Sequence, residues 1–231
     1  MQVKDQQNFF DLAQADCIEW LAAMPSKSVD LIITDPAYQS LEKHRKIGTT
    51  TRLNNWFEIF PNSRYSEFFK ECYRVLKPNT HLYLICDSPT AFLVKPLAEQ
   101  AGFTFWKPLV WNKVFIGMGY HYRAQSEFIL FFEKGHRNLK DLSVGDILTF
   151  PAIKKRDRYP TEKPVGLLEV LINQSSKKGD LVIDPFCGSG STGVAAIRNK
   201  RNFRGCDISS VALALSQSRL ASELGQFSLV G

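Results

Sequence analysis

The sequence predicts an α/β protein built on a doubly wound, mostly parallel sheet. Two apolar strands each lead into a turn with polar residues: residues 29–34 end at Asp35-Pro36, and residues 181–183 end at Asp184-Pro185. Strands that are apolar along their whole length are typical of parallel sheets, which are covered on both faces. Predicted helices alternate with strands along the rest of the chain, and this alternation is the pattern of a doubly wound fold.

In the first half of the chain, a helix over 17–24 is followed by a turn at Pro25–Ser28 and the strand over 29–34. A second helix is expected over 65–76, where apolar residues recur on one face and Pro78-Asn79 marks the end. A third helix is expected over 91–100, where Gly102 closes it. The remaining elements expected here are strands over 81–86, 103–111 and 127–132.

In the second half, residues 135–159 are the least regular stretch. A helix over 161–173 is expected to open at Thr161 as N-cap, with Pro164 in its first turn. Beyond it we expect a strand over 181–184, a helix over 192–198, a strand over 202–207 and a helix over 209–224. Trp106 and Trp111 are expected in the core.

Length and composition fit one domain over residues 1–231, with 44% hydrophobic residues. The net charge of +6 is compatible with a polyanionic partner. No apolar run approaches the roughly 18 residues that span a membrane, so a cytoplasmic protein is expected. The five cysteines and four histidines lack metal-ligand spacing. Buried reduced thiols and no metal site are therefore predicted.

The segment from Gly188 to Gly193 is a glycine turn of the loose form G-x-G-x-x-G, between a strand and a helix. About 20 residues further on, Asp207 ends the next strand, where a carboxylate can bind both hydroxyls of a ribose. Ligands of doubly wound sheets bind at the carboxyl ends of strands. This unit predicts a nucleotide-like cofactor, and by itself it also suits a nicotinamide-dependent oxidoreductase.

The segment Asp35-Pro36-Ala37-Tyr38 carries a different chemistry. An exocyclic amino group of a base is a poor nucleophile because its lone pair is delocalised into the ring. The Asp35 carboxylate and the Pro36 carbonyl could accept its two hydrogens and favour a pyramidal nitrogen. Tyr38 offers a flat face on which a flipped base could stack.

Taken together, these residues resemble the Asp-Pro-Pro-Tyr family of S-adenosylmethionine-dependent DNA amino-methyltransferases. The order of motifs is similar to that of the permuted β group, in which the catalytic motif precedes the glycine turn. The resemblance covers nearly the whole chain, through residues 15–21, 28–36, 74–78, 111–113, 119–123, 127 and 159–164.

The resemblance implies a role for each motif. Asp35, Pro36 and Tyr38 would be catalytic. Asp16 would hold the adenine of S-adenosylmethionine and Asp207 its ribose, while residues 186–192 would surround the methionine portion. The full cofactor-binding set that the resemblance implies is Asp16, Cys17, Asp35, Thr161, Asp184, Phe186, Gly188, Ser189, Gly190, Ser191 and Asp207.

The expected partner is double-stranded DNA. Residues 39–64 would form a DNA-facing loop, and residues 135–159 a short target-recognition region. Phosphate contacts are expected from two basic clusters, Lys43, Arg45 and Lys46 in the first and Lys154, Lys155, Arg156 and Arg158 in the second. Ala37 stands where the family usually has a second proline, and Tyr159 where histidine is common.

The expected reaction is methylation of adenine N6, with cytosine N4 as the nearest alternative. An enzyme acting on RNA, a nicotinamide-dependent oxidoreductase and an inactive DNA-binding homologue are weaker alternatives. The oxidoreductase has no use for residues 35–38. The sequence leaves open whether the protein forms a homodimer, whether a cognate restriction nuclease accompanies it, and which DNA sequence it recognises.

Overall fold

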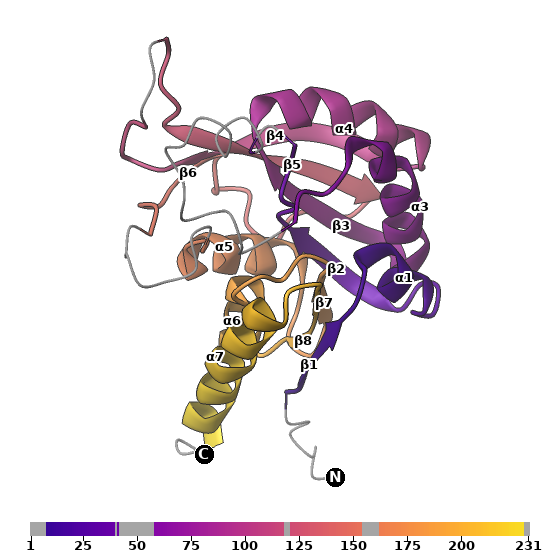
Figure 1. Ribbon diagram of the computed structural model, residues 1–231, viewed down its shortest axis with the longest axis vertical. Helices are drawn as coiled ribbons and strands as arrows, with labels where there is room; N and C mark the ends of the chain where they lie inside the picture. The colour runs from indigo at the N-terminus through magenta and orange to yellow at the C-terminus, as the bar shows by residue number, and fades with distance from the viewer. Residues whose placement is uncertain (1–7, 40, 42–57, 118–120, 154–161, 229–231) are drawn as a thin grey trace.

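The structure is a computed structural model that describes residues 8–39, 41, 58–117, 121–153 and 162–228. Its eight described strands form one sheet in the order β1-β8-β7-β2-β3-β5-β4-β6 (Figure 1). The strands are β1 (Phe10–Gln14), β2 (Val29–Thr34), β3 (Leu76–Cys86), β4 (Thr104–Asn112), β5 (Ser126–Lys134), β6 (Ile147–Thr149), β7 (Leu181–Asp184) and β8 (Asn202–Asp207).

Most of the sheet is parallel, as predicted. Strands β1, β8, β7, β2 and β3 run in one direction, β5 is antiparallel to both β3 and β4, and β6 is parallel to β4. In β2, Ile32 pairs with Ile183 of β7 on one side and with Leu82 of β3 on the other. The carboxyl ends of β2 and β7, which carry the two predicted motifs, therefore lie beside each other.

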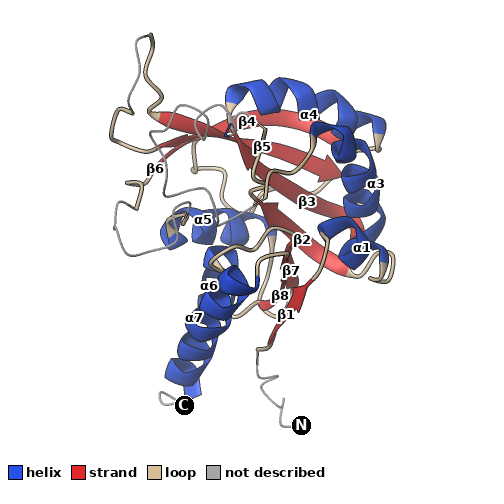
Figure 2. Cartoon of the chain, viewed as in Figure 1, coloured by secondary structure: helices blue, strands red, loops and turns tan. Residues whose placement is uncertain are grey.

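Helices cover both faces of the sheet (Figures 1 and 2). One face carries α1 (Cys17–Ala22), α3 (Tyr65–Val75) and α4 (Ser88–Gln100), and the other carries α5 (Val165–Ser175), α6 (Ser191–Arg198) and α7 (Ser210–Ser228). Alternate side chains of β2 enter different cores: Ile32 packs in the α1–α3–α4 core, whereas Leu31 and Ile33 pack in the α5–α6–α7 core. This division confirms the doubly wound fold.

Two strands, β1 and β6, were not predicted, and several boundaries differ from the sequence prediction. Strand β1 was not predicted, because its sequence Phe-Asp-Leu-Ala-Gln is not a continuous apolar run and the strand is buried only in part. Strand β3 begins at Leu76, directly after α3, and accommodates Pro78-Asn79 in an irregular stretch where Asn79 has φ +60°. Helix α5 begins at Val165, with Pro164 as its N-cap, rather than at Thr161.

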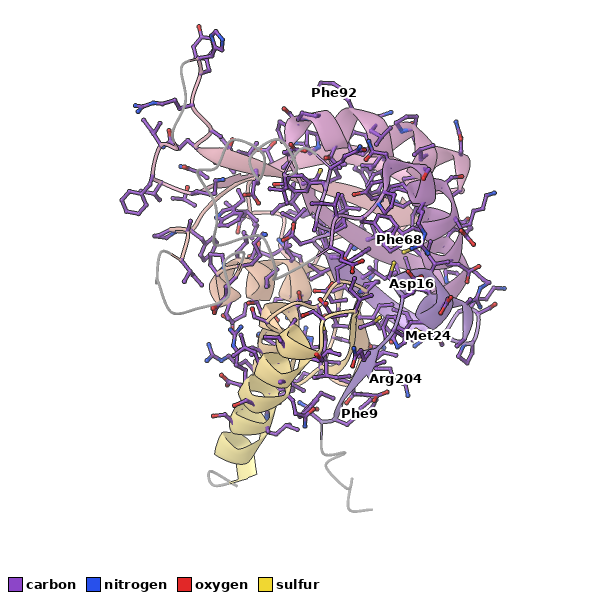
Figure 3. The ribbon with its side chains drawn as sticks, viewed as in Figure 1. Phe9, Asp16, Met24, Phe68, Phe92 and Arg204 are labelled. Carbon is purple, nitrogen blue, oxygen red and sulfur yellow. The ribbon has the colours of Figure 1, made fainter. Side chains whose placement is uncertain are left out.

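The predicted core is correct in part. Trp111 is buried, but the Trp106 side chain is 57% exposed, since it lies on the part of β4 whose outer face has little cover. Phe92 projects from α4 into solvent (Figure 3). All five cysteines are buried and free of disulfides, which confirms the prediction of reduced thiols. Among the described residues, no helix has both the length and the apolar character that crossing a bilayer requires.

Candidate active site

A cavity of about 450 Å³ opens at the carboxyl ends of β2, β7 and β8. It brings together most of the predicted site: Asp16, Cys17, Asp35, Pro36, Tyr38, Asp184, Phe186, Gly188, Ser189, Ser191 and Asp207 all line it. Gly190 lies in the same turn without lining the cavity. Among the described residues, no group of histidine, cysteine or acidic side chains could hold a metal ion.

The glycine turn between β7 and α6 requires small residues. Gly188 and Gly190 have φ +48° and +78°, in the left-handed region, and Gly190 is the N-cap of α6. A Cβ atom on Gly190 would lie 2.8 Å from Oγ of Ser216. That hydroxyl donates to the Gly188 carbonyl at 2.6 Å, so helix α7 holds the turn closely.

Asp184 fixes the turn from inside the protein. Its Oδ1 accepts hydrogen bonds from Thr34 Oγ1 and from the Phe186 N–H, both at 3.0 Å, and its Oδ2 accepts from Thr192 Oγ1 at 2.8 Å. Burial raises the pKa of Asp184 to about 7, although these three donors favour the ionised form. The carboxylate predicted to bind cofactor is thus engaged in joining β2, β7 and α6.

Asp207, at the end of β8, also supports the turn. Its Oδ2 accepts from the Gly188 N–H and its Oδ1 from the Ser209 N–H, both at 2.9 Å. Each carboxylate oxygen has two lone pairs, so both oxygens can accept one further hydrogen bond from the cavity side. Burial raises the pKa of Asp207, and the backbone donors oppose this shift.

Asp16 is the N-cap of helix α1 (Figure 3), and it lines the cavity. Its Oδ1 caps the helix by accepting from the N–H groups of Ile18 and Glu19. Arg64 contacts the same carboxylate through two nitrogens, at 2.7 and 2.8 Å, and this contact is the main reason that the pKa of Asp16 is lowered. Arg64 was not predicted as a site residue, because no motif marks it. Beside Asp16, burial raises the pKa of the Cys17 thiol and keeps it neutral.

The Asp35–Tyr38 segment follows β2 directly. Burial raises the pKa of Asp35 to about 6, against the opposing charge of Lys163. The Ala37 carbonyl accepts from the Phe60 N–H at 2.8 Å, so this segment is tied to the chain that precedes α3. Tyr38 is partly buried against the α1–α3–α4 core, and burial raises its pKa. Its phenol is therefore neutral at physiological pH.

Lys163 is the second residue that sequence reasoning missed. It lies just before α5, and its ammonium group donates to Oδ2 of Asp35. Residues 159–164 are among the segments that carry the resemblance, but no role was predicted for Lys163 itself, which was expected inside a helix. The helix starts later, at Val165, so Lys163 lies outside it and lines the cavity.

A third missed residue is Arg219 on α7. Its Nη1 donates to the Ser189 carbonyl at 2.7 Å, to Ser189 Oγ at 3.0 Å and to Ser191 Oγ at 3.3 Å, and its Nη2 lies 3.0 Å from Glu162 Oε1. Ser189 and Ser191, both predicted to bind the cofactor, are thus held by a guanidinium group. A single arginine on a predicted amphipathic helix gives no signal of this role.

Several predicted residues lie outside the described part of the chain. These are Thr161 and all the residues expected to contact DNA phosphates: Lys43, Arg45, Lys46, Lys154, Lys155, Arg156 and Arg158. The same applies to most of the predicted DNA-facing loop, 39–64, and to the end of the predicted target-recognition region, 135–159. Their roles stay predictions.

Known proteins match both the sequence and the fold. The sequence matches the N6/N4 DNA methylase family over residues 29–154 and 141–218. It is 30% identical to the putative methylase YubD of Escherichia coli K12, over 90% of this chain and 89% of that protein. It is 28% identical to the Type II methyltransferase M.HpaI of Haemophilus parainfluenzae, over 92% of this chain and 74% of that protein.

The fold is similar to that of a putative DNA modification methylase from Thermus thermophilus in complex with S-adenosyl-L-methionine. The TM-score is 0.72 at 23% identity, over 93% of this chain and 94% of that chain. The family and the fold expected from residues 29–36 and 181–193 are therefore confirmed. The chain belongs to the N6/N4 DNA methylase family.

Proposed function

We propose that this protein methylates the exocyclic N6 amino group of an adenine flipped out of duplex DNA. The observation that carries the proposal is the meeting of two motifs in one cavity. Asp35 and Pro36 follow β2, the glycine turn follows β7, and Thr34 and Asp184 join the two strand ends by a hydrogen bond of 3.0 Å. An acceptor pair for an amine thus lies beside a nucleotide-binding turn.

The cofactor half of the cavity suits S-adenosylmethionine. A volume of about 450 Å³ is in the range of small-molecule sites, which is roughly 300–1,000 Å³. Asp207 retains acceptor capacity for ribose hydroxyls, and the left-handed backbone at Gly188 and Gly190 lets the turn approach a ligand closely. Near the turn, Arg219 adds a positive charge that favours a ligand carboxylate. The chemistry that the bound cofactor supplies is a methyl group on a positively charged sulfur.

The base half supplies hydrogen-bond acceptors and a stacking surface. Asp35 and the Pro36 carbonyl accept the two hydrogens of the amino group, which leaves the nitrogen lone pair available for attack. Tyr38 stacks on the base, an interaction worth about 1–3 kcal/mol per base. As the amine becomes cationic on methylation, its surplus proton passes to Asp35 or to water. The free cysteines on the cavity wall are neutral thiols, so no covalent enzyme intermediate is needed.

Two measurements test the proposal. DNA from cells expressing the protein is sequenced with modified-base detection, and its nucleosides are separated by mass. The expected result is N6-methyladenine at a fixed motif. N4-methylcytosine in its place would show that cytosine, the alternative substrate, is the target base. Asp35→Asn should abolish methyl transfer and retain cofactor binding. Asp146→Asn is the matched control, because this exposed carboxylate pairs with Lys107 outside the cavity.

A role in restriction–modification is a further part of the proposal, because M.HpaI is described as a Type II methyltransferase. If the chain serves such a system, DNA methylated by it should resist a nuclease that cuts the same motif. The motif obtained from sequencing identifies candidate nucleases for this test.

A further inference from the structure

Four charged side chains form a cluster where the target amine is proposed to bind, and we call them the charge cluster. They come from four separate elements: Asp35 follows β2, Lys113 follows β4, Glu127 is on β5 and Lys163 precedes α5. The Lys163 ammonium donates to Asp35 Oδ2 and lies 3.8 Å from Glu127 Oε2. On the far side, Lys113 donates to Glu127 Oε1 at 3.0 Å.

One oxygen of the charge cluster is unsatisfied. Glu127 Oε2 is buried and has no hydrogen-bond partner among the described residues. A buried carboxylate oxygen without a donor is costly, so its presence in a native fold needs an explanation. The Lys163 ammonium lies 3.8 Å from this oxygen, which is too far for a hydrogen bond to Glu127 while it is bound to Asp35.

Lys163 and the substrate need the same acceptor. In the proposed reaction Asp35 accepts an N–H from the amino group of the base, but in this structure the N–H of an ammonium group occupies Oδ2 of Asp35. The Lys163 side chain is 12% exposed, so it fills space inside the cavity rather than at its mouth. The amine and the ammonium group therefore compete for the space in the cavity beside Oδ2 of Asp35.

We propose that Lys163 is a positioning residue that holds Asp35 ionised while no base is bound, and that moves to Glu127 Oε2 when the target amine takes its place. The move exchanges one carboxylate partner for another and satisfies the orphan oxygen. No bond is made or broken and no proton is lost. This inference rests on the proposed role of Asp35.

The charges around Asp35 explain why a cation is needed. Glu127 faces Asp35 from β5, and Asp184 on β7 and Asp87 before α4 add negative charge nearby. Lys163 and Lys113 provide the opposing positive charge, while Tyr38 and Cys86 are neutral because burial raises the pKa of each. Burial and the charge of Glu127 raise the pKa of Asp35 and Lys163 opposes them, so without Lys163 this carboxyl group would protonate at a higher pH and lose its acceptor role.

The experiment measures kcat and KM for duplex DNA between pH 6 and 9. Lys163→Met removes the charge and keeps the length of the side chain, Lys163→Arg retains the charge, and Lys107→Met is the matched control on the protein surface. For Lys163→Met we expect the acid limb of the kcat/KM profile, which reports the ionisation of the DNA-free enzyme, to move up by at least one pH unit. The cofactor Kd should stay within twofold, and Lys163→Arg should restore most of the profile.

Glu127→Gln tests the second position of Lys163. Without the second carboxylate, Lys163 should stay on Asp35 and raise KM for DNA at least fivefold, with a smaller effect on kcat. An acid limb in Lys163→Met that coincides with that of the wild type would overturn the proposal, and so would an unchanged KM in Glu127→Gln.

Carbon-13 titration of Asp35 in the DNA-free protein, assigned with Asp35→Asn, keeps the test separate from the proposed function. A shift of its midpoint in Lys163→Met supports the pairing even if the wild type methylates no adenine, and the absence of a shift refutes it.

Discussion

Asp184→Asn should stabilise the protein at high pH, although it alters a buried residue with three hydrogen bonds. The asparagine carbonyl can accept from Thr34 Oγ1 and the Phe186 N–H, as Oδ1 does now. Its NH₂ group can donate to Thr192 Oγ1, because a hydroxyl group also accepts hydrogen bonds. The substitution therefore keeps the network and removes a buried negative charge.

The magnitude follows from the pKa of Asp184, which burial raises from 3.8 to about 7. A carboxyl group with a raised folded-state pKa gives a stabilisation that is fully present below its unfolded pKa and is lost as pH rises through its folded pKa. For this group the loss falls between about pH 4 and pH 7. From pH 5 to pH 9 it amounts to roughly 3 kcal/mol, at about 1.4 kcal/mol per pKa unit. Asp184→Asn lacks this pH dependence.

The assay is urea unfolding of the wild type and the variant at intervals from pH 5 to pH 9. The difference between their free energies of unfolding should change by about 3 kcal/mol across the range, in favour of the variant at pH 9. In thermal unfolding the same change corresponds to roughly 6–12 °C in Tm for a chain of this size. A constant difference between the two proteins would show that Asp184 is ionised throughout and that the reasoning is wrong.

Three further predictions concern the site. Asp207→Ala should weaken binding of S-adenosylmethionine by about 1–3 kcal/mol in calorimetry, since it removes charge-assisted acceptors; an unchanged Kd would contradict the ribose role. Gly190→Ala should lower the free energy of unfolding by about 2–4 kcal/mol, because its φ is left-handed and its new Cβ would lie 2.8 Å from Ser216 Oγ. Gly145→Ala is the control: its Cβ position is open, so the free energy of unfolding should change by less than about 1 kcal/mol. Tyr38→Phe should keep most methyl transfer in a tritium assay and Tyr38→Ala should lose base capture; an inactive Tyr38→Phe would assign the role to the hydroxyl group.

The motifs could be predicted from sequence because each is local. A continuous apolar strand followed by Asp35-Pro36, and a second strand followed by a glycine turn, give their positions directly, and parallel strand direction places both at one edge of the sheet. Asp207 could be found for the same reason, as an acid that ends the next strand. These residues belong to signals that occupy a few consecutive positions.

The residues that were missed act across long sequence separations. Lys163 contacts Asp35 from a segment 128 residues away, and Arg219 reaches Ser189 from 30 residues further along the chain. Their side chains resemble ordinary surface charges in the sequence. The start of α5 decides whether Lys163 lies in the helix: Pro164 was expected in the first helical turn, but it is the N-cap, so Lys163 lies outside the helix. Strand β1 was missed because an edge strand does not need a continuous apolar run.

A buried link joins the two halves of the site. Strands β2 and β7 are neighbours with Ile32 opposite Ile183, and Thr34 and Asp184 extend this pairing by a hydrogen bond at the strand ends. Asp184 also receives the first N–H of the glycine turn, at Phe186. A displacement of either motif would break one of these bonds inside the core, where an unpaired polar group costs about 1–3 kcal/mol. The distance between the proposed amine acceptors and the cofactor turn is therefore set by rigid packing, and this placement is what in-line transfer between two bound groups requires.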